Sequence, residues 1–232
     1  MTVGKNSSDL IKPGAIVGTV HSPESLRVAR RLRRGEVDWL ELRVDHFAGA
    51  PAALLKAAPE LKVPLIVTVR HSAEGGCKGV DYKRRCELYG QFLPFASAID
   101  VELRSATALS EVITEARERG VRLIVSSHDF RTTPSAKRLQ QKVRRAIAAG
   151  ADVVKIAAHA KTAADLQRLL GLFGRKWSRP LSVMAMGRFG KVSRLLFAQA
   201  GSVLNYAYLG SANASGQWPA ADFRKRLEEV EK

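Results

Sequence analysis

The chain of 232 residues contains only two cysteines, Cys77 and Cys86. Two thiols are too few for a disulfide framework, and neither lies in a metal-ligand motif, so we expect a reducing compartment and no structural zinc. The chain also lacks an apolar run of roughly 18–20 residues, the length that crosses a bilayer, and its first nine residues contain no apolar signal-peptide core. These absences predict a soluble, cytoplasmic protein with no membrane partner.

Acidic and aromatic residues are scarce as well. The 22 Asp and Glu face 38 Lys and Arg, which gives a net charge of +16, and aromatic residues make up 6% of the chain. A strong positive charge favours binding to phosphates. However, the basic clusters lie on separate predicted helices, and no aromatic residues alternate with them. We therefore interpret them as solvated helix faces and expect no nucleic-acid partner, although a positive field attracts small anionic substrates.

Short apolar runs that are typical of buried strands recur along the whole chain. There are eight: Ala15–Val20, Val37–Arg43, Val63–Arg70, Ala98–Arg104, Val121–Ser127, Asp152–Ala157, Leu181–Met186 and Ser202–Ala207. Helical patterns separate them, and Pro or Gly marks several helix ends, as at Gly120, Pro134, Gly150 and Pro219. This alternation predicts an α/β fold, and the count of eight favours a (βα)8 TIM barrel in a single domain over residues 1–232. An open, doubly wound sheet is the alternative.

Polar residues gather near the carboxyl ends of these strands, where barrel enzymes carry their chemistry. Glu41 and Arg43 end the second strand, Glu102 and Arg104 end the fourth, and further candidates are Arg70 and His128. Residues two apart lie on the same face of a strand. We therefore expect both pairs to turn their charges into the barrel.

Lys155 lies inside the apolar run 152–158, where an unpaired ammonium would cost several kcal/mol. A chemical role explains it best, because a desolvated amine can attack a carbonyl and form a Schiff base. A lysine with an ordinary pKa of about 10.4 is protonated at neutral pH. We therefore expect burial, together with Arg43 and Arg70, to favour the neutral amine. His128, on the preceding strand, is suited to move protons in the same pocket.

Six motifs occur in order along nearly the whole chain. They are Glu41-Leu42-Arg43-Val44-Asp45; Thr68-Val69-Arg70 with Glu74-Gly75-Gly76; Ser127-His128-Asp129-Phe130 with Thr133-Pro134; Val154-Lys155-Ile156-Ala157; Met184-Ala185-Met186-Gly187 with Ser193-Arg194; and Gly216-Gln217. In these motifs the chain resembles the type I 3-dehydroquinate dehydratases of the shikimate pathway of aromatic amino acid biosynthesis. The resemblance implies a homodimeric lyase that dehydrates 3-dehydroquinate to 3-dehydroshikimate by syn elimination without a cofactor.

The resemblance also implies residue roles. Lys155 would form the Schiff base, His128 would act as general base and then acid, and Glu74 would orient the imidazole. The implied substrate-binding residues are Glu41, Arg43 and Arg70 on the polyol side, Arg194 on the carboxylate, and Phe130 and Met186 against the ring, with Asn213 and Gln217 in a lid after the last strand. An internal salt-bridge network is an equally good interpretation of Glu41, Arg43 and Arg70.

The lid departs from the family pattern, in which a small hydroxyl residue is followed by alanine, proline, glycine and glutamine. Here Asn213 replaces the hydroxyl residue and Ser215 replaces the proline. Asn213 can still donate to a carboxylate or hydroxyl, but the loss of proline implies a less preorganised lid.

Other site types find little support. The remaining histidines, His21, His46, His71 and His159, show no ligand spacing with one another or with the cysteines, so we expect no metal. Residues 187–190 are too short for a nucleotide loop. Two alternatives stay open, namely another Schiff-base barrel enzyme such as an aldolase or transaldolase, and a catalytically silent homologue that binds an acidic partner or nucleic acid.

Overall fold

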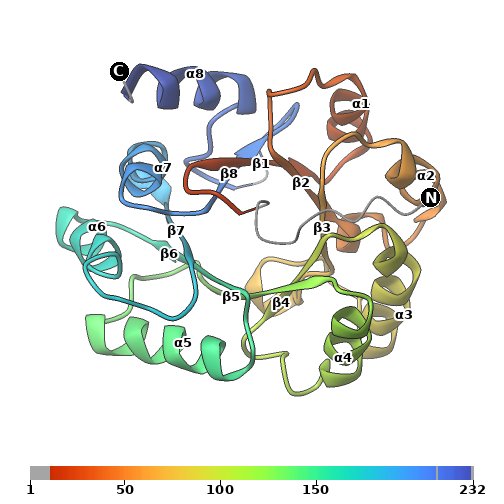
Figure 1. Ribbon diagram of the computed structural model, residues 1–232, viewed down its shortest axis with the longest axis horizontal. Helices are drawn as coiled ribbons and strands as arrows, with labels where there is room; N and C mark the ends of the chain where they lie inside the picture. The colour runs from red at the N-terminus through yellow and green to blue at the C-terminus, as the bar shows by residue number, and fades with distance from the viewer. Residues whose placement is uncertain (1–10, 213, 231–232) are drawn as a thin grey trace.

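The computed structural model describes residues 11–212 and 214–230, and these form eight parallel strands surrounded by helices (Figure 1). The strands are β1 (Ala15–Val20), β2 (Trp39–Arg43), β3 (Leu65–Thr68), β4 (Ala98–Glu102), β5 (Arg122–Asp129), β6 (Val153–His159), β7 (Leu181–Met186) and β8 (Leu204–Tyr208). All eight predicted strands are present, several with ends shifted by one or two residues. In the order β7-β6-β5-β4-β3-β2-β1-β8, consecutive strands from β1 to β7 pair with each other, and β8 pairs with β1.

A seam between β7 and β8 closes the barrel almost completely. The backbone N–H of Val203 donates to the carbonyl of Leu181 at 2.9 Å, and the Ser182 hydroxyl donates to the carbonyl of Leu204 at 2.6 Å. These contacts bring the two ends of the sheet together. The predicted (βα)8 barrel is confirmed, and the open doubly wound sheet is excluded.

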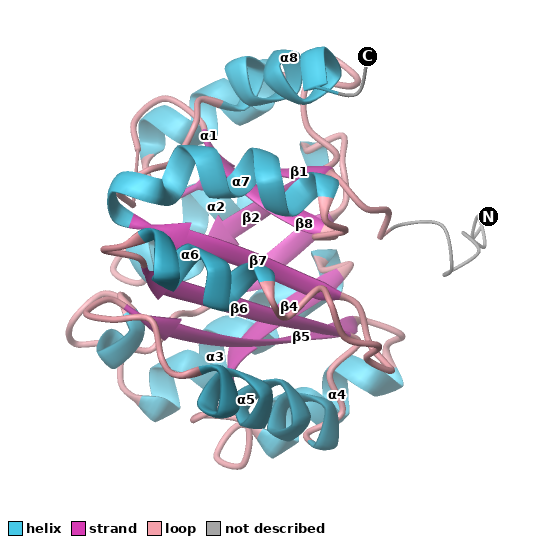
Figure 2. Cartoon of the chain, turned by 90° about the vertical axis from the view of Figure 1, so that its left-hand side faces the viewer, coloured by secondary structure: helices cyan, strands magenta, loops and turns pink. Residues whose placement is uncertain are grey.

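The helices form the outer ring in the side view (Figure 2). They are α1 (Pro23–Arg31), α2 (Ala52–Ala57), α3 (Tyr82–Phe92), α4 (Ser110–Glu118), α5 (Ala136–Ala148), α6 (Ala163–Leu170), α7 (Gly190–Gln199) and α8 (Ala220–Val230), with short 3-10 helices η1 (Val44–Phe47), η2 (Ala58–Glu60), η3 (Ser72–Glu74), η4 (Leu93–Phe95) and η5 (Gly187–Phe189). N-terminal capping residues explain where several helices begin. Ser22 and Ser25 form a capping box before α1, and the Ser135 hydroxyl accepts from the N–H of Arg138 before α5. In the described part of the chain, no helix combines the length and apolar character needed to cross a membrane.

The barrel interior is built in layers, because every second residue of a strand points inward. Apolar side chains, including Val17, Trp39, Ile66, Ile124 and Val153, fill its amino-terminal part. Two residues further along the strands, the inward positions are mainly polar: Glu41, Thr68, Asp100, Ser126 and Lys155. Another two residues along, the inward positions hold Arg43, Arg70, Glu102 and His128. The apolar floor thus supports a polar site at the carboxyl ends of the strands.

Candidate active site

Lys155 lies at the centre of this polar layer and is only 4% exposed. Its Nζ lies 2.8 Å from Asp100 Oδ2, 3.3 Å from Glu41 Oε1 and 3.7 Å from the centre of the Tyr206 ring. Two carboxylates and an aromatic face are the surroundings of an ammonium ion. Arg43 and Arg70 were expected to favour the neutral amine, but both are paired with carboxylates, so their contribution to that effect is offset.

Arg70 is the hub of the buried charges. Its guanidinium donates to both Asp100 oxygens at 2.9 and 2.8 Å, to Glu102 Oε1 at 3.2 Å and to the Ser126 hydroxyl at 2.7 Å. Although burial alone would raise it, Arg70 and Lys155 hold the pKa of Asp100 well below its usual value. Asp100 is therefore a carboxylate that fixes Arg70 and Lys155 relative to each other.

His128 and Glu74 form the pair that the motifs predicted. His128 Nδ1 lies 3.0 Å from Glu74 Oε2, and the same oxygen accepts from the backbone N–H of His128 at 2.8 Å. A carboxylate partner assigns the proton to Nδ1, which leaves Nε2 as the basic nitrogen. In the register of β5 with β6, Ser126 pairs with Lys155 and His128 with Ala157, so His128 lies one inward position beyond the lysine.

Burial, followed by the positive charges of Arg70 and Lys155, lowers the pKa of His128 well below 6.5. The imidazole is therefore neutral throughout the neutral pH range. We predict that kcat/KM keeps its plateau as the pH falls through 6.5 and declines only at lower pH, because that profile reports the free enzyme's essential base. The measurement is kcat/KM from pH 4.5 to 8 at constant ionic strength. A decline centred at or above pH 6.5 would show that the imidazole is not depressed or is not the base.

A single cavity of about 230 Å³ joins these groups. Its lining includes most of the predicted site residues: Glu41, Arg43, Arg70, Glu74, His128, Phe130, Lys155, Met186, Arg194 and Gln217, together with Gly75, Ala157, Met184, Tyr206 and Ala214. The Phe130 ring stacks on the His128 ring, with a centroid separation of 6.3 Å and an interplanar angle of 16°. Asn213 lies outside the described residues.

Arg194 is held by backbone carbonyls. Its Nε donates to Tyr206 at 2.8 Å, and its Nη1 donates to Gly190 at 2.9 Å and to Gly216 at 2.7 Å. Burial lowers its pKa to about 10, so it remains charged at neutral pH. The guanidinium thus lines the cavity and also ties α7 to the loop after β8. Its predicted role on the substrate carboxylate stays a prediction.

The loop after β8 packs tightly against the start of α7. A Cβ at Gly190 would lie 2.5 Å from Gly216 Cα, so the two backbones touch where only glycine fits. The Ser215 hydroxyl accepts from the N–H of Gly187 at 3.2 Å. Ser215 therefore supplies an anchor that a proline side chain at this position could not make.

Arg43 contacts a group of side chains that could ligate a metal ion. It donates to both oxygens of Asp45 at 3.0 and 2.8 Å, and its Nη2 lies 3.3 Å from His46 Nε2. Asp45, His46 and Cys77 bring ligand atoms within 4.8 Å of one another, a grouping that sequence spacing did not reveal. The guanidinium of Arg43 already provides the positive charge at that point, so the geometry does not favour a metal ion.

The prediction that Arg104 turns inward with Glu102 is wrong. β4 ends at Glu102, so the alternation of faces does not continue into the following turn, and Arg104 is exposed. Glu102 is fully buried and instead accepts from Arg85 Nη2 at 2.6 Å. Arg85 comes from α3, outside the barrel, and was not among the predicted residues.

The fold and the site together define a (βα)8-barrel enzyme with a buried lysine and a carboxylate-bound histidine at the carboxyl ends of its strands. The chain belongs to the type I 3-dehydroquinase family, whose model matches residues 17–232. This confirms the resemblance seen in the motifs.

Relatives and solved structures agree with that assignment. The chain is 33% identical over 236 residues to a 3-dehydroquinate dehydratase of Methanosarcina barkeri, covering 96% of this chain and 97% of the relative. It is 34% identical over 213 residues to that of Thermococcus gammatolerans, covering 91% and 97%. The crystal structure of the Geobacillus kaustophilus 3-dehydroquinate dehydratase superimposes with a TM-score of 0.85 at 29% identity, covering 94% of this chain and 91% of that chain.

Proposed function

We propose that this member of the type I 3-dehydroquinase family dehydrates 3-dehydroquinate to 3-dehydroshikimate through an imine on Lys155. The observation that carries the proposal is one cavity that contains both a buried lysine and a histidine oriented by a carboxylate. A solved relative from Clostridium difficile, 27% identical with a TM-score of 0.84 and covering 99% of this chain and 95% of that one, contains covalent modified comenic acid. A covalent modification in that relative supports the proposal of a covalent intermediate here.

In the first step, the Lys155 ammonium gives up one proton, and the resulting neutral amine attacks the carbon of the ring ketone. A C–N bond forms, the carbonyl oxygen leaves as water with that proton and a second proton from the nitrogen, and an iminium ion results. Asp100 and Glu41, which contact the ammonium in the resting structure, then face the positive charge of the iminium. Preorganised carboxylates at this point stabilise the charge that develops during the reaction.

In the second step, Nε2 of His128 removes a proton from the carbon next to the iminium, and the electron pair of that C–H bond moves into an enamine. The imidazolium then protonates the departing hydroxyl group, which leaves as water and regenerates an iminium. Because one histidine serves both transfers, the proton and the hydroxyl leave from the same side. Hydrolysis of the iminium releases the product and frees Lys155.

The cationic lining suits a small carboxylate substrate that carries several hydroxyl groups. Glu41, Arg43 and Arg70 are proposed to face the polyol side, and Arg194 is proposed to face the carboxylate, a task that suits a guanidinium. Phe130 and Met186 would pack against the ring. A homodimer, a cytoplasmic location and a reaction without a cofactor remain predictions from the sequence.

The direct test is incubation of the purified protein with 3-dehydroquinate, with ultraviolet detection of the conjugated product. Formation of 3-dehydroshikimate at a rate proportional to protein concentration supports the proposal. A folded protein that binds 3-dehydroquinate without converting it would be the catalytically silent homologue. Turnover of a phosphorylated aldol substrate instead would favour the aldolase-like alternative.

Gln217 offers a test of substrate contact. It is buried and lines the cavity, and its Oε1 accepts from the N–H of Ala214 at 3.3 Å. We predict that Gln217→Ala weakens substrate binding by about 1–3 kcal/mol, because a hydrogen bond to a polar ligand is lost. The measurement is apparent substrate affinity by calorimetry in a His128→Ala background, where elimination is blocked and any imine formation is common to both proteins.

Ser215→Ala is the matched control, because it removes the anchor to Gly187 without removing a group that lines the cavity. It should weaken binding less than Gln217→Ala does. Equal losses would mean that Gln217 acts by ordering the loop, and no loss in Gln217→Ala would show that this loop is not part of the substrate site.

A further inference from the structure

The positive charge of the chain is concentrated in one part of the barrel. Residues 130–221 contain 15 Lys and Arg but only two acidic residues, Asp152 and Asp165, so this segment carries +13 of the total +16. It includes α5, α6 and α7, which are neighbours on the left side of Figure 1. Apart from the buried Lys155 and Arg194, the basic residues of this segment thus belong to one part of the barrel wall, and α5 carries five of them.

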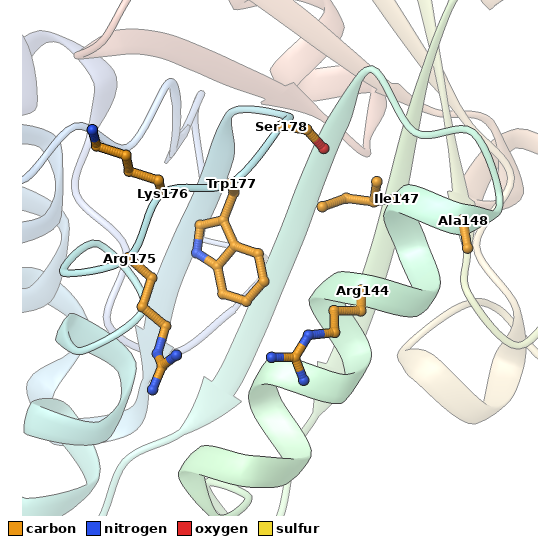
Figure 3. A pocket seen from close by; sticks show the side chains of 7 residues that line it. All are labelled: Arg144, Ile147, Ala148, Arg175, Lys176, Trp177 and Ser178. Atoms are coloured by element: carbon orange, nitrogen blue, oxygen red, sulfur yellow. The ribbon is translucent and has the colours of Figure 1, made fainter.

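A groove of about 600 Å³ opens on this side, between the end of α5 and the segment before β7. Arg144 and Ile147 line it from α5, and Arg175, Lys176 and Trp177 line it from the other side. Figure 3 shows the indole of Trp177 between the guanidinium groups of Arg175 and Arg144, whereas Lys176 extends in the opposite direction. An aromatic ring flanked by two arginines can stack on a base and contact its phosphates.

Packing and a hydrogen bond fix the position of the Trp177 indole. Trp177 is half-buried against the hydrophobic core, and its Nε1 donates to the carbonyl of Leu172 at 2.9 Å. Arg144 and Arg175 are both exposed. Among the described residues, neither forms an ion pair with a carboxylate. The fixed ring would lose little freedom when a ligand binds, and the two guanidinium groups can turn to a phosphate without breaking an ion pair with a carboxylate.

We propose that this groove binds single-stranded nucleic acid, with a base stacked on Trp177 and backbone phosphates at Arg144 and Arg175. A polymer fits better than a mononucleotide, because the positive charge continues beyond the groove along α5, at Lys137, Arg138 and Arg145. This inference departs from the expectation based on sequence alone, in which the basic residues were solvated faces without an aromatic partner.

The groove lies at the end of the barrel opposite the catalytic cavity, since α5 ends before β6 starts and residues 171–180 precede β7. Binding there and catalysis can therefore be tested separately. Variants in the groove should leave turnover of 3-dehydroquinate unchanged, so failure of this proposal would say nothing against the dehydratase activity, and the reverse also holds.

The experiment measures the anisotropy of a labelled single-stranded DNA of mixed sequence, about 12 nucleotides long, as protein is added at several salt concentrations. The Arg144→Ala/Arg175→Ala double variant should bind at least about tenfold more weakly at 0.15 M salt, and its plot of log affinity against log salt should be less steep by about 1.4, the value for two lost phosphate contacts on a single strand. Trp177→Phe should retain most of the affinity, because it keeps a stacking face.

Arg33→Ala/Arg34→Ala is the matched control, with the same loss of charge on the exposed turn after α1. It should change binding little. An equal loss in the control would show that the attraction is due to net charge alone and would overturn the proposal. So would the absence of binding by the intact protein at 0.15 M salt, or displacement of the oligonucleotide by AMP at an equal nucleotide concentration.

Discussion

A Lys155→Ala variant should fold and lose essentially all turnover of 3-dehydroquinate. The covalent step needs the amine, and no neighbouring group in the described cavity offers a replacement, because its other cations are arginines. Folding should survive, since Asp100 keeps both hydrogen bonds from Arg70 when the ammonium is removed. The measurements are kcat, circular dichroism and trapping of the imine with borohydride.

Lys161→Ala is a suitable control, because Lys161 is an exposed lysine just beyond the end of β6. It should retain both turnover and trapping. If Lys155→Ala keeps turnover within about tenfold of the unaltered protein, roughly 1.4 kcal/mol of barrier, the loss is too small for a covalent step and the role of Lys155 is refuted.

The second large effect is expected for His128→Ala, which should form the imine but stall before elimination. Loss of a general base and acid typically reduces turnover by about 10²–10⁴-fold. The amine of Lys155 keeps its contacts with Asp100 and Glu41 in this variant, so attack on the ketone should continue. The measurement is kcat together with the mass of the protein after borohydride treatment.

If the borohydride adduct still forms while turnover is lost, His128 acts after imine formation. If trapping disappears while the variant stays folded and still binds the substrate, His128 acts earlier than proposed. The adjacent Phe130→Ala variant serves as the control for lost packing, because it removes the ring that stacks on His128 while leaving the imidazole and Glu74 in place.

Two features of the sequence indicated the proposed reacting pair. A lysine in an apolar strand stands out because burial of a charge is costly, and a histidine at the end of the preceding strand is suited to move protons in the same pocket. Asp100 carries the same signal, as an acid within the apolar strand Ala98–Glu102, but no role was predicted for it. The separate error at Arg104 came from extending that strand past Glu102.

The partners from outside the barrel were harder to predict. Arg85 lies in a run of three basic residues, which suggests a solvated helix face, yet it shares a helical face with the buried Leu88, Tyr89 and Phe92. The helical periodicity could therefore have predicted that Arg85 is buried. The pairing of Asp45 with Arg43 could not be predicted in this way, because Asp45 lies in the 3-10 helix η1, where side chains do not alternate between two faces as they do in a strand.

The lid shows a third kind of limit. Sequence comparison with the family pattern predicted a looser loop, because a proline is missing at Ser215. The structure shows that the same serine accepts a hydrogen bond from Gly187 and that Gly216 touches Gly190. Contacts between two loops depend on the closed barrel, so residue types alone could not indicate them.

The measurement that tests the central claim most directly is trapping of the unaltered protein with 3-dehydroquinate and borohydride, followed by intact mass and peptide mapping. The proposed mechanism predicts one adduct per chain, located on Lys155 and dependent on both the substrate and the reductant. A protein that turns over 3-dehydroquinate without an adduct, or with the adduct on another lysine, would contradict it.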